Sequence, residues 1–302
     1  MRKITKKELK EILDKHQKWL TNQEGGKQAD LQKVNLQFAN LAEVNLSKAI
    51  LKEANLEYAD LRKANLSEAN LEYANLHKAD LSKANLQKSQ LTEANISKAI
   101  LEDTNLLHAN LTKANLSEAD LFNANLSKAF LRETNLEKSC LELVRLYDAF
   151  LSKTNLQDAY LKNAYLVNAF LNHTNLKNAD LTNAKLENAD ARNSNLTEAN
   201  LVQAKMRGTQ LPNGIYQVVG SGKANLSMSY NVVKDQLIWN YWKDDKGNHL
   251  ESFKEFIEKK YGKKGKKPNI TYYTEYMTAI KYFETLKKNY EILKEKPKLH
   301  LI

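Results

Sequence analysis

Hydrophobic positions recur every five residues over residues 29–211. The central position of each unit is leucine in 34 of 37 consecutive units, and the exceptions are Ile96, Ala191 and Met206. Two residues earlier the chain has alanine in 26 units and Ser, Thr or Val in the others, while the remaining three positions are mostly polar. A period of five fits neither the period of a helix nor that of a strand. Each unit is therefore predicted to point one large and one small apolar side chain inward and its polar side chains outward.

A second period, of twenty residues, lies over the first. The residue before each central one is asparagine at every twentieth position from Asn35 to Asn195. Two further columns with this spacing are Phe130, Phe150, Phe170 and Thr134, Thr154, Thr174. Four units are therefore predicted to close one coil, which gives about nine stacked coils and a rod of ~43 Å at ~4.8 Å per coil. The stacked asparagine amides are expected to hydrogen-bond to the backbone at turns and to one another.

These units resemble the consensus of the pentapeptide repeat family, Ala-(Asp/Asn)-Leu-x-x, over residues 29–211. The resemblance implies a mainly β fold: a right-handed quadrilateral β-helix in which four pentapeptides form the four sides of each coil. It also implies a protein of bacterial type. Some members of the family, including the quinolone-resistance proteins, are thought to present an acidic rod that imitates DNA to DNA gyrase or topoisomerase IV.

The net charge of +10 is unevenly distributed along the chain. Residues 1–28 carry +4, residues 29–211 carry −1 and residues 212–302 carry +7. A DNA duplex has one negative charge per ~1.7 Å, and a nearly neutral rod with columns of mixed sign does not present such a field. DNA mimicry toward gyrase is therefore the disfavoured alternative. Nucleic-acid binding through the basic residues 212–302 is a second alternative, although the aromatic residues there have the spacing of a small core.

The two ends of a stacked rod expose unpaired backbone and apolar side chains, so both are expected to be capped. Residues 1–28 are predicted to form an N-terminal capping helix that begins with a capping box at Thr5 and Glu8 and ends at Gly25–Gly26. Its apolar face consists of Leu9, Ile12, Leu13, His16 and Leu20. His16 is interpreted as a partly buried cap residue and not as a ligand.

Residues 212–302 are predicted to form a C-terminal α+β capping domain. The strand patterns lie at residues 215–219, 224–233 and 236–242, and the helix patterns at about 250–261 and 271–294, joined by a basic loop at 263–267.

The sequence contains no pattern typical of catalysis or metal binding. The six histidines have no metal-ligand spacing, and the single cysteine, Cys140, excludes an internal disulfide and a multi-cysteine zinc site. We therefore predict a protein that is not an enzyme, without catalytic residues, cofactor or metal. The chain has no apolar run long enough for a membrane span and its start lacks the apolar core of a signal peptide, so a cytoplasmic location is expected.

Aromatic side chains depart from the polar pattern of the outward positions between residues 130 and 170. Phe130, Phe150 and Phe170 replace Asn or Asp in one column, and Tyr160 and Tyr165 do so on the next two sides of a single coil. Clustered exposed apolar surface often marks an interface, whereas stacked rings also stabilise a solenoid. The hypothesis is that these five residues form a surface for an unidentified protein partner or a second copy of the chain. The predicted function is a non-enzymatic scaffold or protein–protein interaction rod.

Overall fold

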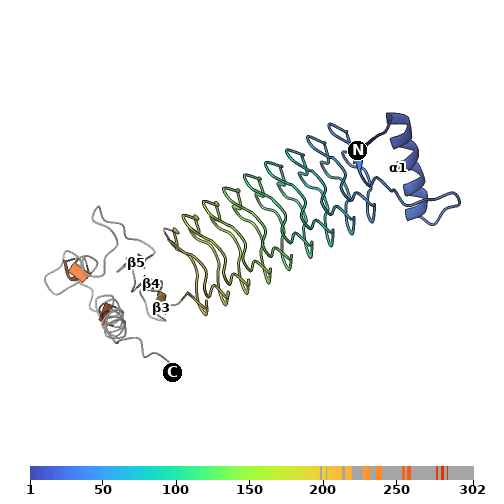
Figure 1. Ribbon diagram of the computed structural model, residues 1–302. Coiled ribbons are helices and arrows are strands. Elements are labelled where there is room, and N and C mark those ends of the chain that lie inside the picture. Colours follow the sequence, from blue (N-terminus) through green and yellow to red (C-terminus); the bar gives the residue numbers. More distant parts are fainter. Residues whose placement is uncertain are drawn as a thin grey trace, which may run out of the picture.

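A computed structural model describes residues 1–197, 199–201, 203–212, 215–219, 227–231, 236–239, 254–255 and 257–259, together with Met277, Ile280, Lys281 and Glu284. Residues 29–211 wind into coils that stack as a straight rod (Figure 1). Each residue before a central one pairs in parallel with the residue twenty positions further on, as in Asn55 with Asn75 and Phe130 with Phe150. The predicted twenty-residue coil of four units is confirmed.

The geometry of one unit explains its five-residue length. The N–H of Leu56 donates to the carbonyl of Asn75 at 2.7 Å, and the N–H of Asn75 donates to the carbonyl of Ala54 at 2.9 Å. A turn follows at once, because the N–H of Ala59 donates back to the carbonyl of Leu56 at 3.0 Å and Tyr58 has a positive φ of 56°. Only one residue in five therefore lies in a β-bridge, so the sheet character of the rod is carried by isolated bridges instead of long strands.

The axis of the rod is its hydrophobic core. The central leucines from Leu41 to Leu181 are at most 1% exposed, and the alanines before them from Ala49 to Ala179 are equally buried. Burying each leucine contributes ~1.5–3 kcal/mol before the loss of chain entropy is counted. Where threonine replaces alanine its hydroxyl is satisfied, since Thr134 Oγ1 donates to the carbonyl of Leu111 at 2.7 Å. The same bond is made by Thr104, Thr154 and Thr174.

The N-terminal helix α1 spans Lys6–Leu20 and starts as predicted. Thr5 Oγ1 accepts from the N–H of Glu8 at 3.1 Å, and the N–H of Thr5 donates to Glu8 Oε2 at 2.6 Å, which completes the capping box. The apolar side chains that pack against the core of the rod are Ile4, Leu9, Ile12 and Leu13.

The predicted end of this helix at Gly25–Gly26 was wrong, because α1 ends at Leu20. The N–H of Gln23 donates to the carbonyl of Lys18 at 2.8 Å, and the N–H of Asn22 donates to the carbonyl of Trp19 at 3.1 Å. These two bonds form a Schellman motif, and Asn22 takes the left-handed conformation it requires, with φ of 53°. Asn22 therefore ends the helix, where the sequence analysis had predicted that glycine would do so.

A short strand precedes α1 and was not predicted. Strand β1 (Arg2–Lys3) pairs in parallel with strand β2 (Val34–Asn35) of the first coil, and the N–H of Arg2 donates to the carbonyl of Lys33 at 3.0 Å. This strand covers one backbone edge that the first coil leaves open.

Three strands follow the rod, namely β3 (Ile215–Val219), β4 (Ser227–Asn231) and β5 (Gln236–Trp239). They form an antiparallel sheet in the order β3-β4-β5. The predicted strand at 215–219 is confirmed, and the other two are confirmed over the part of the chain that the structure describes. Of the two predicted helices, residues 254–255, 257–259 and four single residues are described and are helical. The basic loop at 263–267 lies outside the described residues.

The two stretches of described helix are in contact with each other. Lys254 Nζ lies 2.9 Å from Glu284 Oε1, and Ile257 and Ile280 are fully buried. None of the helices that the structure describes has the length and apolar character needed to cross a bilayer.

Candidate functional site

The rod has four sides, and consecutive units lie on consecutive sides, so that residues ten apart face opposite directions. We name the sides by the residues that precede the central leucines. The asparagine side carries Asn35 to Asn195, the phenylalanine side carries Phe130, Phe150 and Phe170, the tyrosine side carries Tyr160, and the basic side carries Arg145, Tyr165, Lys185 and Lys205. The asparagine side lies opposite the basic side, and the phenylalanine side lies opposite the tyrosine side.

The three phenylalanines form a continuous stack. Their ring centroids are 5.0 Å apart from Phe130 to Phe150 and again from Phe150 to Phe170, with interplanar angles of 6° and 2°. The side chains remain 46%, 39% and 42% exposed in chain order. Because the rings face one another, their edges face the solvent and form an apolar ridge along this side of the rod.

The two tyrosines of the predicted surface lie on other sides. Tyr160 is 59% exposed on the side opposite the phenylalanine ridge. Tyr165 lies on the basic side between them, with Lys185 Nζ 4.1 Å above its ring and the ring of Tyr147 at 5.6 Å. The five residues therefore do not form one flat surface. The coil turns through a right angle between units, and this separates residues that are close in sequence.

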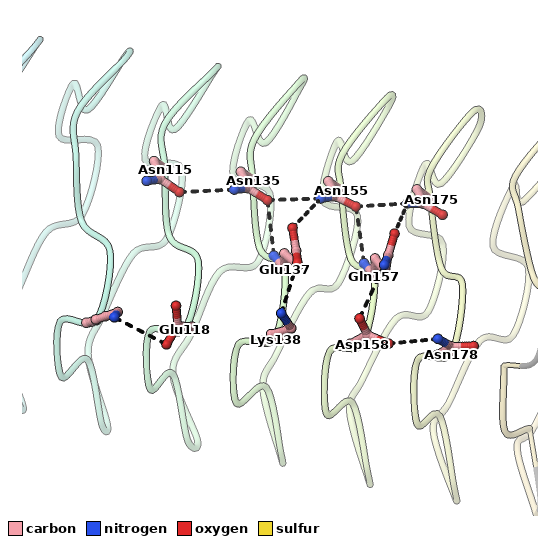
Figure 2. Close-up of polar contacts among 11 residues, drawn as sticks. Asn115, Glu118, Asn135, Glu137, Lys138, Asn155, Gln157, Asp158, Asn175 and Asn178 are labelled. Carbon is pink, nitrogen blue, oxygen red and sulfur yellow. Dashed lines mark hydrogen bonds and ion pairs between the residues drawn. The ribbon is translucent and has the colours of Figure 1, made fainter.

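The asparagine side is bonded to itself along its length. Asn135 Nδ2 donates to Asn115 Oδ1 at 3.2 Å, and Asn155 Nδ2 donates to Asn135 Oδ1 at 3.1 Å. Figure 2 shows this row of amide bonds. Each amide oxygen also accepts a backbone N–H two residues on, as Asn135 Oδ1 does from Glu137 at 3.2 Å. Both bonds predicted for this column are confirmed, and the asparagines are scaffold residues.

The first coils of the basic side also have a column of hydrogen-bonded asparagines, but the later coils have other residues in this column. Its ladder of amide bonds joins Asn65, Asn85, Asn105 and Asn125. The next four positions of the column are Arg145, Tyr165, Lys185 and Lys205. The sequence analysis named only Tyr165 among them, although reading the column at a spacing of twenty residues reveals all four.

Charged residues elsewhere on the rod pair with the opposite charge in the next coil. Lys63 Nζ lies 2.8 Å from Glu43 Oε1 and Lys52 Nζ lies 3.0 Å from Glu72 Oε2. Further pairs with this spacing are Lys33–Glu53, Lys48–Glu68, Lys98–Glu118 and Lys113–Glu93. The predicted mixing of signs within columns is confirmed.

His16, on the face of α1 that is turned to the rod, is fully buried, more deeply than predicted. Its Nδ1 accepts from the N–H of Ala29 at 3.1 Å, and its ring stacks on Trp19 at 5.6 Å. Burial lowers the pKa of His16, and the backbone of Ser47 opposes part of this shift, although Nε2 makes no hydrogen bond of its own. A neutral imidazole that accepts a backbone N–H is a structural residue.

Cys140 lies half-buried on the tyrosine side, and burial raises the pKa of its thiol, which opposes formation of a reactive thiolate. Over the described part of the chain, no three His, Cys, Asp or Glu side chains gather in an arrangement that could hold a metal ion.

Comparison with known proteins finds matches over the rod. The sequence profile of pentapeptide repeats matches in eight copies over residues 29–67, 59–97, 89–127, 99–137, 139–178 and 174–211. No curated protein sequence matches significantly.

Among solved structures, HetL from the cyanobacterium Nostoc sp. strain PCC 7120, described as involved in heterocyst differentiation regulation, is 30% identical. The match covers 66% of this chain and 95% of HetL with a TM-score of 0.36. QnrB1, described as a plasmid-mediated fluoroquinolone resistance protein, is 17% identical over 62% of this chain and 91% of its own, with a TM-score of 0.45. Rfr23 from the cyanobacterium Cyanothece 51142 is 31% identical over 34% of this chain and 60% of its own, with a TM-score of 0.14.

Proposed function

Because the chain belongs to the pentapeptide repeat family, whose fold is a right-handed quadrilateral β-helix, we propose that it is a non-enzymatic scaffold that binds a protein partner on the outside of its rod. The axis of the described coils is filled by buried leucines. Contacts with other molecules therefore belong to the four outer sides. Of these, the asparagine side uses its amides on itself, so the contact surface is sought on the other three.

The exposed phenylalanine ridge is the observation that carries this proposal. Each of the three rings keeps about two fifths of its surface in contact with solvent, in a column that elsewhere has Asp, Asn, Gln or Ile. Ring stacking stabilises the coils, but the exposed edges remain apolar. Apolar surface gathered at one place on a polar rod is typical of a protein contact. Tyr160, on the opposite side, and Tyr165, on the neighbouring basic side, are proposed as separate contacts.

The test replaces Phe130, Phe150 and Phe170 together by asparagine, the residue of this column at position 110. We expect the folded variant to lose the partner that the wild-type chain captures from its native cell, or to lose self-association measured by analytical ultracentrifugation. A matched control replaces Phe38 and Tyr58, another exposed ring stack at 5.2 Å, by asparagine. If the folded triple variant still captured the same partner and had the same molecular mass in solution, the phenylalanine ridge would have only a structural role.

Both end segments are proposed to close the rod. We assign residues 1–28 to an N-terminal cap, residues 29–211 to the β-helix and residues 212–302 to a C-terminal α+β cap. The packing of α1 against the core and the pairing of β1 with β2 support the first assignment. A cytoplasmic location stays a prediction.

DNA mimicry toward gyrase is not supported by the charges of this rod. At 17% identity, QnrB1 shares the fold and no more. Pairing of Lys63 with Glu43 and of Lys52 with Glu72 neutralises charge within columns instead of building a continuous acidic field. We expect no inhibition of DNA supercoiling by gyrase at micromolar concentrations of the chain, and inhibition there would reinstate mimicry.

A further inference from the structure

On the basic side, Lys185 stacks directly on Lys205, and neither lysine forms an ion pair with an acidic side chain of the described coils. Among these coils, this is the one stacked pair of lysines in which both members lack such a partner. Lys185 and Lys205 are β-bridge partners, and the carbonyl of Lys205 accepts from the N–H of Leu186 at 2.7 Å, which fixes their backbones in register. Like charges directly opposite each other in a ladder destabilise it. Lysines also stack at Lys63–Lys83 and Lys78–Lys98, but there one lysine of each pair has a glutamate partner, Glu43 for Lys63 and Glu118 for Lys98. The stack of Lys185 on Lys205 has no such compensation in the part of the rod that the structure describes, so it is not the arrangement that stability alone selects.

Apolar and aromatic side chains lie in the two coils before these lysines, beside Arg145 and Tyr165, at positions that are polar in most other units. Tyr165 contacts both Lys185 and Tyr147. Leu143 and Val167 occupy outward turn positions on the two edges of this side. Together Arg145, Tyr165, Lys185, Lys205 and this apolar border form what we call the basic strip.

Glu187 lies beside the strip and has one buried carboxylate oxygen. It belongs to the same unit as Lys185, and its Oε2 is buried without a hydrogen-bond partner. A buried carboxylate oxygen without a donor is costly. Because this oxygen is buried, it lies beneath the strip and is not part of its contact surface.

We propose that the basic strip binds an extended acidic peptide segment of a partner protein, with carboxylates toward Lys185, Lys205 and Arg145 and an apolar residue against Tyr147 and Val167. This inference rests on the proposed function, because it names the class of protein partner, but it concerns a different side from the phenylalanine ridge. Carboxylates supply the charge opposite to that of Lys185, Lys205 and Arg145.

A nucleic acid fits the same strip less well. The ring of Tyr165 is contacted by Lys185 on its face and by Tyr147, which leaves little room for a base to stack. The chain's own termini are poor occupants, because residues 1–28 and 212–302 carry +4 and +7.

The test is the substitution Lys205→Glu in the full chain. The introduced carboxylate would face Lys185 as glutamates face lysines elsewhere on the rod, so we expect the thermal midpoint to stay or rise. The probe is a short fluorescein-labelled peptide of alternating glutamate and phenylalanine, read by fluorescence anisotropy. Its affinity for the variant should fall about tenfold or more, and binding to the wild type should weaken with added NaCl. Lys177→Glu, with the same charge change at the edge of the asparagine side, is the matched control and should bind as the wild type does.

Three results would overturn the proposal. They are equal binding of the glutamine version of the probe, equal binding by the Lys205→Glu and wild-type chains, and binding of oligothymidylate in place of the peptide. The variant without the three phenylalanines should bind the probe normally. Failure of the basic strip and failure of the phenylalanine ridge are therefore distinguishable.

Discussion

At the residue scale, the second turn residue of each unit carries the main backbone cost of the rod. From Lys33 to Gln203 the described non-glycine residues at this position have φ between 54° and 62°. This left-handed region costs most side chains ~1–2 kcal/mol, and asparagine and glycine tolerate it best. The C-terminal units use asparagine there at positions 163, 168, 178, 183, 188 and 193, whereas the earlier units use mainly lysine and glutamate. The earlier coils therefore keep a strain that the later ones relieve.

Replacing Lys88 by asparagine should relieve this strain at a position without an ion pair. Lys88 has φ of 57°, and we expect the substitution to raise the free energy of unfolding by about 0.5–1 kcal/mol. Urea denaturation followed by circular dichroism measures the change. Gln87→Asn, one residue earlier in the same turn and outside the left-handed region, is the control. An equal gain at both positions would show that backbone strain is not the cause.

His16 makes the N-terminal end of the rod sensitive to acid. Burial lowers its pKa, so the folded state holds the imidazole neutral while the unfolded chain protonates near pH ~6.5. The stability that the neutral ring contributes is therefore fully present above pH ~6.5 and is lost as the pH falls from there toward the lowered pKa. Protonated Nδ1 would also point a proton at the N–H of Ala29, which now donates to it.

We expect the amides of α1 and of the first coil to lose hydrogen-exchange protection between pH 7 and pH 5, after correction for the intrinsic exchange rate. His16→Gln should flatten this pH dependence, and His173→Gln, which removes an exposed histidine far from α1, controls for the number of titrating groups. Protection that falls equally in the wild type and in the His16→Gln variant would exclude His16 as the cause.

At the element scale, an asparagine of the asparagine side makes two kinds of hydrogen bond, one within its own turn and one to the next coil. Asn115 Oδ1 accepts from the N–H of Ser117 at 3.2 Å and from Asn135 Nδ2 at 3.2 Å. Asn70, on the phenylalanine side and similarly buried, accepts only from the N–H of Glu72, at 3.0 Å. The difference in stability between substitutions at Asn115 and Asn70 therefore measures the contribution of the amide bonds between coils, apart from that of the bond within the turn.

Asn115→Ala should lower the free energy of unfolding by about 2–3 kcal/mol, and Asn70→Ala by about 1 kcal/mol, because each net hydrogen bond contributes ~0.5–1.5 kcal/mol. Chemical denaturation of both variants measures the difference. Equal losses would mean that the amide ladder adds nothing to the turn.

Some elements were predictable from the sequence because their physics is local or strictly periodic. The capping box needs only Thr5 and Glu8 at the correct spacing, and the coil needs only the twenty-residue columns. The Schellman end at Asn22 was missed because glycine is the more frequent residue there and two glycines follow closely. Strand β1 was missed because its partner lies about thirty residues away.

The candidate surface was predicted by residue type and by column, but not in its side-chain contacts. The sequence shows which outward positions are aromatic, and the spacing of twenty gives the phenylalanine stack. The same spacing also places Tyr160 and Phe170, which are ten residues apart, on opposite sides of the coil. The contact of Lys185 with Tyr165 and the unpaired oxygen of Glu187 depend on side-chain conformations, which no spacing specifies.

At the scale of the whole molecule, the rod is nearly one-dimensional, since each coil contacts only its neighbours. Stability in such proteins is approximately a sum over coils and their interfaces, so opening starts at the weakest end. The central leucines up to Leu181 are almost fully buried, whereas Leu196, Ala199 and Leu211 are half-buried. At the other end, α1 packs against the first coils.

Hydrogen exchange read by mass spectrometry should therefore show a gradient, with residues 191–211 exchanging before residues 51–181. Weakening the packing of α1 should destabilise the N-terminal end of the rod. Leu13→Ser removes a side chain that packs against the core, so we expect faster hydrogen exchange in residues 29–50 and no change in the central coils. Gln17→Ser, on the exposed face of the same helix, introduces the same residue without that loss and should change little. If Leu13→Ser instead accelerated all coils equally, the rod would unfold as a single cooperative unit, and the nearest-neighbour description of its stability would be wrong.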